Sequence, residues 1–489
     1  MALVLAIDQG TTNSKALLID EAGAIVARAS APVGVSYPQS GWVEQSAEDI
    51  WRSVVDVATR VIAAATQPIA AIGISNQRES VLIWDRRTGK PIGPCITWQC
   101  RRSADRIAAL HSPAFERQVA ATTGLGLDPL FPAAKLGWLL DAYPEARRLA
   151  DGENLCAGTV DAWLAFNLTG GKVHATDFGN ASRTQLFDIR AGEWSADLAE
   201  AFDVPVGILP TPTASDGDFG MTAAASGLPT GIPIRAVMGD SHAALFGHGV
   251  RAPGAVKATY GTGSSLMTLT AEPVASTHGL STTIGWRRGD RTAFALEGNI
   301  TVSAQAAAWT ANLLGLADAA ALTALAKTVP DSGGAVFVPA LAGLGAPHWN
   351  DSARAIFSGM SFGTTPAHLA RAIFEAIALQ IRDVFVAMEQ DAGLRLDVLS
   401  VDGGATDNDF LMQLQADVLN RPVQRKAVTE LSAAGAAVMA GAAVGMWGDA
   451  GPEAIRASRD QIAPSMDDAA RQKLLAGWSQ ALARAMLAT

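Results

Sequence analysis

One short pattern occurs in each half of the chain and constrains its fold more than any other feature. An apolar run, a tight turn rich in glycine and hydroxyl residues and a second apolar run follow one another over residues 3–20, with the turn at 8–14. The same order returns over residues 255–269, with the turn at 260–265. Each copy predicts a β-hairpin with a Gly/Thr loop at its tip. Two copies in one chain indicate two related lobes rather than a solenoid of short repeats.

Strand-like and helix-like segments alternate outside the hairpins. Residues 48–65 have helical spacing after an acidic start, and residues 68–74 form an apolar run typical of a strand. Further along, the pattern predicts a strand at 396–401, a turn at 402–405 and a helix at 408–419. This alternation predicts the α/β fold class. A strand, a Gly-Gly turn and a helix also form a unit that suits phosphate binding.

The two lobes meet without a Ser/Pro-rich segment that would mark a flexible linker. We predict a first lobe at residues 1–250, a second lobe at 251–445 and a helical tail at 446–489 that packs on the second lobe. Lobes joined in this way pack tightly, and ligands favour the cleft between them.

Composition and charge limit the partners of the chain. Its 489 residues carry 37 Lys and Arg against 47 Asp and Glu, a formal charge of -10 without long runs of one sign. This balance argues against nucleic acid and anionic membranes and favours a small diffusible substrate. Cys95, Cys100 and Cys156 form no CxxC motif, which is typical of a reducing cytosol. With no signal-peptide pattern and no apolar run of roughly 20 residues, we expect a soluble cytoplasmic protein.

The first hairpin loop combines the side chains that a phosphate chain with Mg²⁺ requires. Within eight positions it has the carboxylate of Asp8, the hydroxyls of Thr11 and Thr12 and the cation of Lys15. An ordinary polar turn accounts for this loop equally well, but the Gly-Thr-Gly run at 261–263 in the second loop favours phosphate. The chain has no GxxxxGK[ST] motif, so any ATP would have to bind between the two hairpins.

Two other positions carry side chains suited to a hydroxyl substrate. Asp240 follows the apolar run 234–238, and a carboxylate at a strand end could accept the proton of an attacking hydroxyl. Asp240 could also be a helix N-cap, because residues 243–246 look helical. Arg78 and Glu79 follow a strand and combine donors with an acceptor for vicinal hydroxyls, although a surface ion pair is the commoner arrangement.

The remaining polar motifs are less specific. The turn at Gly403 and Gly404 lets the backbone approach adenine, ribose or phosphate closely, but a tight turn without a ligand has the same pattern. We assign no role to His242. The seven histidines show no HExxH spacing, so we predict no protein-bound transition metal.

Ordered motifs along most of the chain resemble those of the FGGY carbohydrate kinases. The motifs are 8–12 (DQGTT), 41–44 (GWVE), 76–79 (NQRE), 98–102 (WQCRR), 158–161 (GTVD), 180–184 (NASRT), 260–263 (YGTG), 343–347 (GLGAP) and 401–405 (VDGGA). The resemblance implies two ribonuclease H-like lobes, of the actin and hexokinase type, around a central cleft. It also implies transfer of the γ-phosphoryl group of MgATP to a primary hydroxyl of a small polyol or sugar.

The matching motifs imply roles for individual residues. Asp240 matches the catalytic base of the family, and Asp8 matches the acid that organises Mg²⁺ through water. The residues that match the ATP site are Thr11, Thr12, Asn13 and Lys15 in the first phosphate loop, Gly261 and Thr262 in the second, and Gly404 and Asn408 beside adenosine. Arg78, Glu79 and Trp98 match the substrate pocket. FGGY kinases often form dimers or tetramers, so the resemblance implies a homodimer or homotetramer.

The chain resembles the glycerol kinases most among FGGY kinases, yet it departs from them at three pocket positions. Leu130 replaces a tyrosine, Ser241 a glutamine and Ser265 an aromatic residue. Two of these changes shorten the side chain, so we expect a roomier, more polar pocket for a longer polyol or ketose. A pentulose kinase of the xylulokinase type is the alternative enzyme. Ala304 and Ala308 replace a glycine and a glutamine near adenine, which leaves the preferred base open.

Two readings without kinase activity are a silent sugar-binding or regulatory relative and an actin-like structural protein. Retention of Asp8 and Asp240 argues against the first, because a protein that only binds needs no base on a hydroxyl. Arg78, Glu79 and Trp98 argue against the second, because they suit a sugar or polyol.

Overall fold

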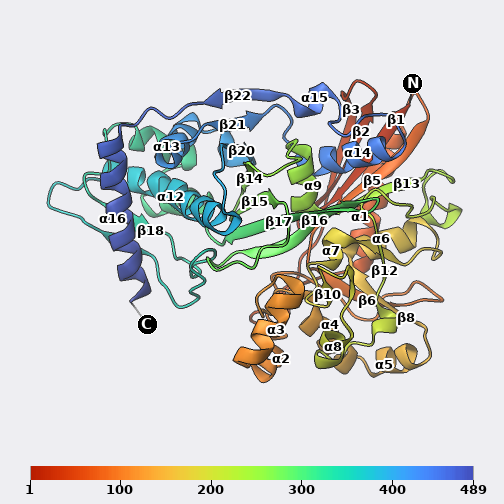
Figure 1. Cartoon of the computed structure of the whole chain (residues 1–489). Helices are drawn as coiled ribbons and strands as arrows, with labels where there is room; N and C mark the ends of the chain where they lie inside the picture. The colour runs from red at the N-terminus through yellow and green to blue at the C-terminus, as the bar shows by residue number, and fades with distance from the viewer. Residues whose placement is uncertain (1, 488–489) are drawn as a thin grey trace.

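The computed structural model describes residues 2–487, which form two α/β lobes (Figure 1). The first lobe is built on a mixed sheet. Its strands, in spatial order, are β13 (Ile234–Gly239), β5 (Ile69–Asn76), β1 (Leu3–Gln9), β2 (Asn13–Asp20) and β3 (Ile25–Pro32). β1 and β2 form the first predicted hairpin, and β1, β5 and β13 run parallel. These three parallel strands therefore end at one edge of the sheet, where three of the polar motifs begin.

Helices cover both faces of this sheet. The helices are α1 (Ala47–Ile62), α6 (Val160–Leu168), α9 (Asp240–Gly247) and α14 (Leu431–Ala443). Leu3, Leu5 and Ile7 of β1 pack with α1 and α6, whereas Val4 and Ala6 pack with α9 and α14. Because β1 is buried on both faces, its sequence is a continuous apolar run rather than an alternating one.

Helix α14 comes from the second half of the sequence but packs on the sheet of the first lobe. A Cβ atom on Gly435 would overlap the carbonyl oxygen of Ala243 in α9, and one on Gly247 would overlap that of Leu431. Glycine at both positions lets the two helices approach closely. The division at residue 250 stays a prediction, and α14 is an element of the second segment that packs across it.

A smaller sheet and short helices form the lower part of the first lobe in Figure 1. Its strands, in order, are β4 (Glu44–Gln45), β7 (Cys95–Ile96), β6 (Val81–Asp85) and β8 (Leu155–Thr159). The helices are α2 (Ala104–Leu110), α3 (Pro113–Thr123), α4 (Pro132–Ala142), α5 (Pro144–Asp151), α7 (Phe178–Ala181) and α8 (Ala196–Ala201). The pairs β9 (Ala175–Asp177) with β12 (Thr211–Thr213) and β10 (Phe187–Asp188) with β11 (Glu193–Trp194) complete this part.

The second lobe has a larger mixed sheet. Its strands, in order, are β16 (Ser281–Arg288), β17 (Arg291–Ile300), β15 (Ser264–Thr270), β14 (Ala255–Tyr260), β20 (Val398–Asp402), β21 (Val423–Lys426) and β22 (Ser458–Ile462). The hairpin of β14 and β15 is the second one that the sequence predicts. The surrounding elements are α10 (Gln305–Leu313), α11 (Ala319–Ala326), α12 (Pro366–Ala392), α13 (Asp409–Leu419), β18 (Val336–Val338) and β19 (Ile356–Ser358).

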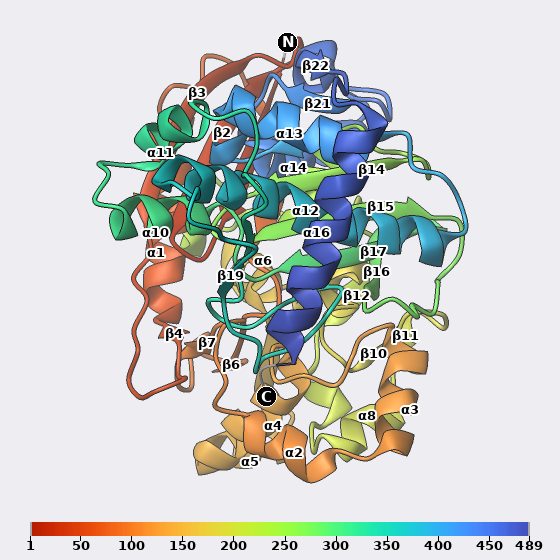
Figure 2. The ribbon, with the colours of Figure 1, turned by 90° about the vertical axis from the view of Figure 1, so that its left-hand side faces the viewer.

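The tail after residue 445 contains more than the predicted helix. It comprises α15 (Glu453–Arg456), the edge strand β22 and α16 (Asp468–Met486). β22 pairs antiparallel with β21, and Arg425 forms an ion pair with Asp460 at 2.6 Å. The strand escaped prediction because residues 458–462 lack an apolar alternation. Figure 2 shows α16 lying across the second lobe, where Trp478 is buried next to α12 and β18.

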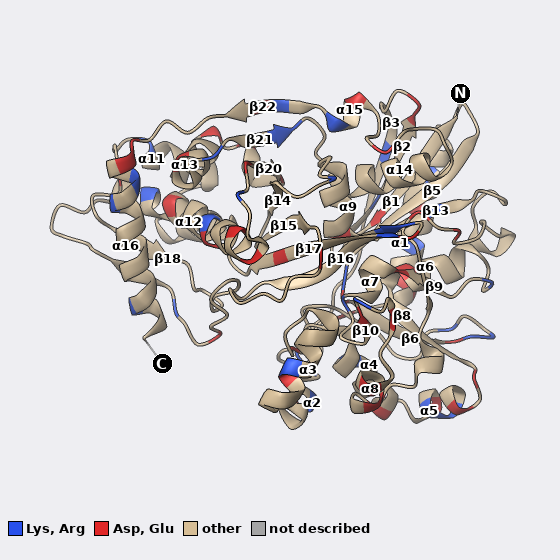
Figure 3. Ribbon diagram, in the orientation of Figure 1, with Lys and Arg blue, Asp and Glu red and all other residues tan. Residues whose placement is uncertain are grey.

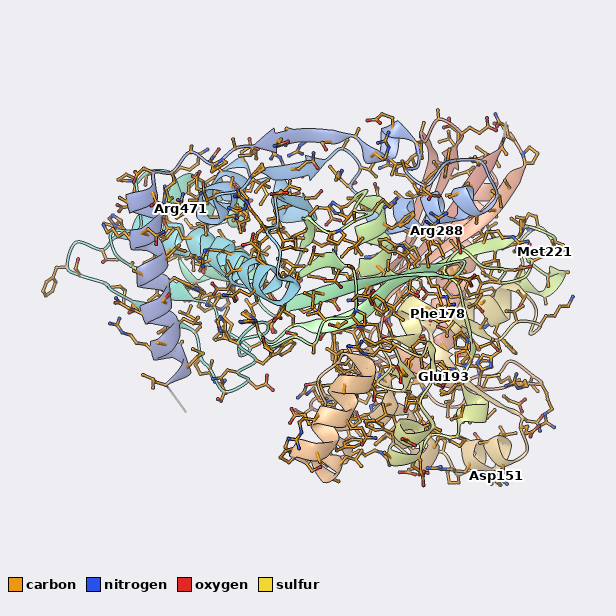
Figure 4. All side chains as sticks on the ribbon, viewed as in Figure 1. Asp151, Phe178, Glu193, Met221, Arg288 and Arg471 are labelled. Atoms are coloured by element: carbon orange, nitrogen blue, oxygen red, sulfur yellow. The ribbon has the colours of Figure 1, made fainter. Side chains whose placement is uncertain are left out.

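Ionic and aromatic contacts join the two lobes away from their central helices. Arg288 of β16 pairs with Asp216 of the first lobe at 3.1 Å, and it also pairs with Asp449 of the tail at 2.8 Å. The guanidinium of the neighbouring Arg287 lies 4.5 Å from the centre of the Phe178 ring. Figure 4 labels Arg288 and Phe178 at this junction. The second sheet is thus attached directly to the first lobe.

Acidic and basic residues are interspersed over both lobes (Figure 3). Over residues 2–487, every helix is either too short or too polar to cross a membrane.

Candidate active site

Asp240 is the first residue of α9 and directly follows β13. The N-cap position is held by Gly239, so Asp240 is not the N-cap. Its Oδ1 atom accepts a hydrogen bond from the backbone N–H of Ser241 at 2.6 Å, and its side chain is 39% exposed. Burial of the carboxyl raises the pKa of Asp240, whereas the positive charge of Arg78 lowers it. A carboxylate that is partly open to solvent and tuned by an arginine can accept a proton.

Asp8 is the penultimate residue of β1, at the same edge of the sheet, and it lies opposite Ser75 of β5. The hydroxyl of Ser75 donates to Asp8 Oδ1 at 2.8 Å. Burial, with a smaller effect of the Asp240 carboxylate, raises the pKa of Asp8 to about 6, although Ser75 and Lys15 act in the opposite direction. Two carboxylates that disfavour each other's charge create a place for a cation.

The residues near Asp8 suit Mg²⁺ better than a metal held only by protein ligands. Among residues 2–487, no three His, Cys, Asp or Glu side chains gather as a metal site. Mg²⁺ typically takes one or two carboxylates and completes its shell with water and substrate phosphates. Asp8, acting through water as the sequence predicts, could hold such an ion.

Arg78 and Glu79 are buried, so the surface ion pair considered from the sequence is wrong. The terminal nitrogens of Arg78 bind both carboxylate oxygens of Glu297, at 2.5 and 3.2 Å, and its Nε lies 3.3 Å from Asp240 Oδ1. Glu79 has a φ of +59° and accepts a hydrogen bond from Arg183 Nε at 2.6 Å. The two sequence neighbours therefore belong to one buried cluster that reaches Asp240.

Sequence reasoning assigned no role to Arg183, Glu297 or His242. Arg183 lies in the NASRT motif, and Glu297 lies in the apolar strand β17, where a charged residue is itself a signal of a buried ion pair. His242 is buried with its Nε2 3.4 Å from Arg78 Nη1. Burial holds the pKa of His242 well below its usual range, so the ring is neutral beside this arginine.

Trp98 connects the predicted substrate pocket to the first phosphate loop. Its indole N–H donates to Thr11 Oγ1 at 3.0 Å, and the residue is 38% exposed. Gln45 Nε2 donates to the carbonyl of Thr11 at 2.8 Å, and Gln77 Nε2 donates to Gln45 Oε1 at 2.9 Å. This network holds the loop and the tryptophan in a fixed relation.

The three positions at which the motifs predict a departure from glycerol kinases lie partly exposed. Ser241 follows Asp240 in α9, and Ser265 of β15 donates its hydroxyl to Glu297 Oε1 at 3.4 Å. The carbonyl of Leu130 accepts a hydrogen bond from Lys135 Nζ at 2.5 Å. Lys135 Nζ also lies 3.4 Å from the carbonyl oxygen of Glu79, so Leu130 is tied to the same cluster.

The second lobe brings its own predicted loops to one edge. β14 and β20 are parallel neighbours, so the loop at Gly261 and Thr262 lies next to the turn at Gly403 and Gly404. A Cβ atom on Gly403, with a φ of +97°, would overlap the carbonyl oxygen of Tyr260, whereas the space beside Gly404 is open. Close backbone packing at Gly403 and open space beside Gly404 suit contact with a nucleotide.

The remaining predicted nucleotide residues differ in their surroundings. Asn13 is exposed and donates its amide to Thr12 Oγ1 at 3.2 Å. Asn408 is the N-cap of α13, where its Oδ1 accepts from the backbone N–H of Phe410 and Leu411. Its Nδ2 also donates to Thr323 Oγ1 at 2.9 Å, so Asn408 fixes the start of the helix that follows the turn.

Two α/β lobes that each carry a hairpin with a Gly/Thr loop, together with carboxylates at the strand ends of the first lobe, are the features expected of a phosphotransferase of the actin and hexokinase type. The models of the N-terminal and C-terminal domains of the FGGY family of carbohydrate kinases match residues 3–247 and 256–444. The chain belongs to this family, which confirms the resemblance drawn from its motifs.

Individual relatives match over nearly the full length of the chain. A glycerol kinase from Alkalilimnicola ehrlichii and an apulose kinase from Pectobacterium atrosepticum are each 46% identical, over 99% of this chain and 98% of theirs. The crystal structure of Plasmodium falciparum glycerol kinase with ADP is 32% identical with a TM-score of 0.94, over 99% of this chain and 98% of that one. The xylulose kinase structure from Rhodospirillum rubrum is 27% identical with a TM-score of 0.87, over the same shares.

Membership of the family confirms the α/β fold with two lobes and the class of reaction. The chain is a kinase that uses ATP with Mg²⁺ and phosphorylates an alcohol group of a polyol or sugar. Membership leaves the particular substrate open, because relatives of equal identity are named for glycerol and for apulose.

Proposed function

We propose that this kinase transfers the γ-phosphoryl group of MgATP to a primary hydroxyl of a polyol or ketose longer than glycerol. The observation that carries the proposal is the pair of serines beside the base and the buried cluster. Ser241 adjoins Asp240, and Ser265 contacts Glu297, so both short side chains leave room and offer hydroxyls. An acceptor with more hydroxyls than glycerol can use both features.

Asp240 is the general base in this proposal, because its side chain is 39% exposed and lies 3.3 Å from Arg78 of the proposed acceptor pocket. It would accept the proton of the acceptor hydroxyl as that oxygen attacks the γ-phosphorus. Arg78, Glu79 and Trp98 would hold the acceptor's other hydroxyls, with Leu130, Ser241 and Ser265 forming the rest of the pocket. Correct alignment accounts for much of the rate in phosphoryl transfer, which requires little covalent chemistry from the protein.

The nucleotide would lie between the two hairpin loops. Thr11, Thr12, Asn13 and Lys15 from the first lobe, with Gly261 and Thr262 from the second, would bind phosphate oxygens. Gly404 would face adenosine, with Asn408 supporting it as the cap of α13. Asp8 would hold Mg²⁺ through water, and the ion neutralises charge on the phosphates when it is bound.

The domain roles follow from these assignments. Residues 1–250 would carry the acceptor and the first phosphate loop, residues 251–445 the nucleotide, and the tail at 446–489 would support the second lobe. We also propose a cytoplasmic location, which the buried free thiols of Cys95, Cys100 and Cys156 support. A homodimer or homotetramer is proposed from the family, and light scattering on the purified protein tests it.

The test is a substrate panel with the purified protein and MgATP. Glycerol, erythritol, pentitols, ribulose, xylulose and gluconate are compared by kcat/KM in an assay coupled to ADP release. We expect an acceptor of four or more carbons to exceed glycerol. A clear preference for glycerol would overturn the proposed substrate class, and turnover of no member would leave the acceptor outside this panel.

A pentulose kinase is the second candidate. The apulose kinase relative, at 46% identity, supports it, because that enzyme is named for a sugar rather than for glycerol. Higher kcat/KM for ribulose or xylulose than for the pentitols of equal length would favour this candidate over a polyol kinase.

A further inference from the structure

Glu297 connects the second lobe to the acceptor side of the first lobe. It lies on β17, is 1% exposed and forms ion pairs with two arginines of the first lobe. Arg78 binds both of its oxygens, and Arg183 Nη1 lies 2.9 Å from Oε2. Its Oε1 also accepts the hydroxyl of Ser265 at 3.4 Å. The surrounding positive charge holds the pKa of Glu297 well below its usual range, so the carboxylate is ionised.

Three of the proposed acceptor residues are therefore linked through this one carboxylate. Arg78 and Ser265 touch it directly, and Glu79 is reached through Arg183, whose Nε donates to Glu79 Oε1 at 2.6 Å. Arg183 also stacks over the ring of Phe131, 5.3 Å from its centre. A side chain with these contacts fixes where these three residues lie.

The link to Asp240 passes through the guanidinium fork of Arg78. A bidentate pair with Glu297 fixes the plane of the fork and leaves Nε, rather than a terminal nitrogen, facing Asp240 at 3.3 Å. Without Glu297, the terminal nitrogens would be free to bind Asp240 directly. The base would then lose the open side that an acceptor hydroxyl needs.

Stability alone gives a weak reason for such a cluster. Burying two arginines and two glutamates costs solvation that their mutual attraction only partly repays, and apolar residues often serve as well. A cluster retained at the acceptor pocket instead favours a role in arranging that pocket.

We propose that Glu297 is the positioning residue of the acceptor pocket: from the second lobe it sets the orientation of Arg78, Ser265 and, through Arg183, Glu79. The inference rests on the proposed function, because it assumes that these residues receive the acceptor. Among residues 2–487, Glu297 forms hydrogen bonds and ion pairs with Arg78, Arg183 and Ser265 but with none of the proposed phosphate-binding residues Thr11, Thr12, Asn13, Lys15, Gly261 and Thr262, so its effect should fall mainly on the acceptor.

The test compares the full-length wild type with Glu297→Gln, Glu297→Asp and the control Glu375→Gln. Glu375 is a buried carboxylate of α12 that pairs with Arg371 at 3.1 Å, and it has no contact with the pocket residues named above. Each variant is assayed with its best acceptor and with ATP in turn. We expect Glu297→Gln to raise the KM of the acceptor roughly tenfold or more and to leave the KM of ATP within about twofold. Glu297→Asp should recover part of the loss, and Glu375→Gln should change neither KM.

A double-mutant cycle with Arg78→Lys tests whether Glu297 acts through the arginine fork. Lysine keeps the charge but lacks the fork, so Glu297→Gln should cost much less in kcat/KM in that background than in the wild type. Additive losses, or equal rises in the KM of ATP and of the acceptor, would overturn the proposal.

A variant that fails to fold can be distinguished from one that folds but loses the positioning of the acceptor. If Glu297→Gln does not fold, the comparison of Glu297→Asp with wild type decides, and unchanged kinetics for both substrates would contradict the positioning role. A wild type that phosphorylates only glycerol would overturn the proposed substrate class but leave the Glu297 test intact, because the test uses whichever acceptor is best.

Discussion

Arg78 contacts the carboxylates of both Glu297 and Asp240: its terminal nitrogens bind Glu297, and its Nε lies 3.3 Å from Oδ1 of Asp240. The first carboxylate is buried, whereas the second is 39% exposed on its side chain. Burial raises the pKa of Asp240, and the arginine opposes that rise. The arginine therefore opposes protonation of the base.

Replacement of Asp240 by asparagine should remove the proton acceptor with little change of shape. We expect kcat to fall about 10²- to 10⁴-fold, the usual contribution of a positioned general base. The assay is ADP release with the best acceptor of the panel. Binding of ATP, followed as a rise in Tm on adding MgATP, should persist in Asp240→Asn. A kcat within a few-fold of wild type would remove the assignment of Asp240 as base.

The raised pKa of Asp8 predicts that the stability of the folded protein depends on pH and on Mg²⁺. Its pKa is raised to about 6 in the folded protein, so the folded state binds the proton more tightly than the unfolded state. The resulting stabilisation is present below the unfolded value near 4 and is lost as pH rises through 6. At pH 7 the ionised carboxylate thus costs about 2 to 3 kcal/mol in the absence of a cation.

Asp8→Asn should therefore raise the Tm of the Mg²⁺-free protein at pH 7.5, with a smaller gain at pH 5. Mg²⁺ with ATP should stabilise the wild type more than the variant, and phosphorylation should be lost. Thermal unfolding at several pH values, with and without Mg²⁺, measures both effects. A variant that is less stable than wild type at pH 7.5 would contradict the cost assigned to Asp8.

The small side chain of Ser265 predicts a preference for an acceptor longer than glycerol. Phenylalanine at this position would fill the space beside Glu297 and remove the hydroxyl that contacts it. We expect Ser265→Phe to shift the ratio of kcat/KM toward glycerol by about tenfold or more over the longer acceptor. Ser479→Phe, on the exposed face of α16, is the matched control and should leave the ratio unchanged. An unchanged ratio in Ser265→Phe would place Ser265 outside the acceptor pocket.

The sequence predicted the parts of the site that short motifs contain. Both hairpins, the Gly-Gly turn after β20 and the positions of Asp8 and Asp240 at strand ends follow from local patterns of apolar and polar residues. Arg78 and Glu79 were also identified, although their burial was not, because the alternative of a surface pair has the same local pattern.

The contacts between distant segments could not be predicted from local patterns. Glu297 lies more than 200 positions from Arg78, and only the approach of β17 to the first lobe brings them together. The same holds for α14, whose alanine-rich sequence fits any buried helix and gives no sign that it packs on the first sheet. Strand β22 was missed because it is held by backbone pairing and an ion pair rather than by an apolar face.

The contact of α14 with α9 gives a prediction about how the base is placed. Gly435 lies so close to α9 that a methyl group would overlap the carbonyl oxygen of Ala243, and backbone cannot yield as a flexible side chain can. We expect Gly435→Ala to lower Tm by several degrees, consistent with the roughly 1 to 3 kcal/mol that overpacking costs, and to reduce kcat because α9 begins at Asp240. Gly448→Ala is the control, since a Cβ atom there meets no neighbour within 4 Å. Equal stability and activity of both variants would show that α9 can move without disturbing the base.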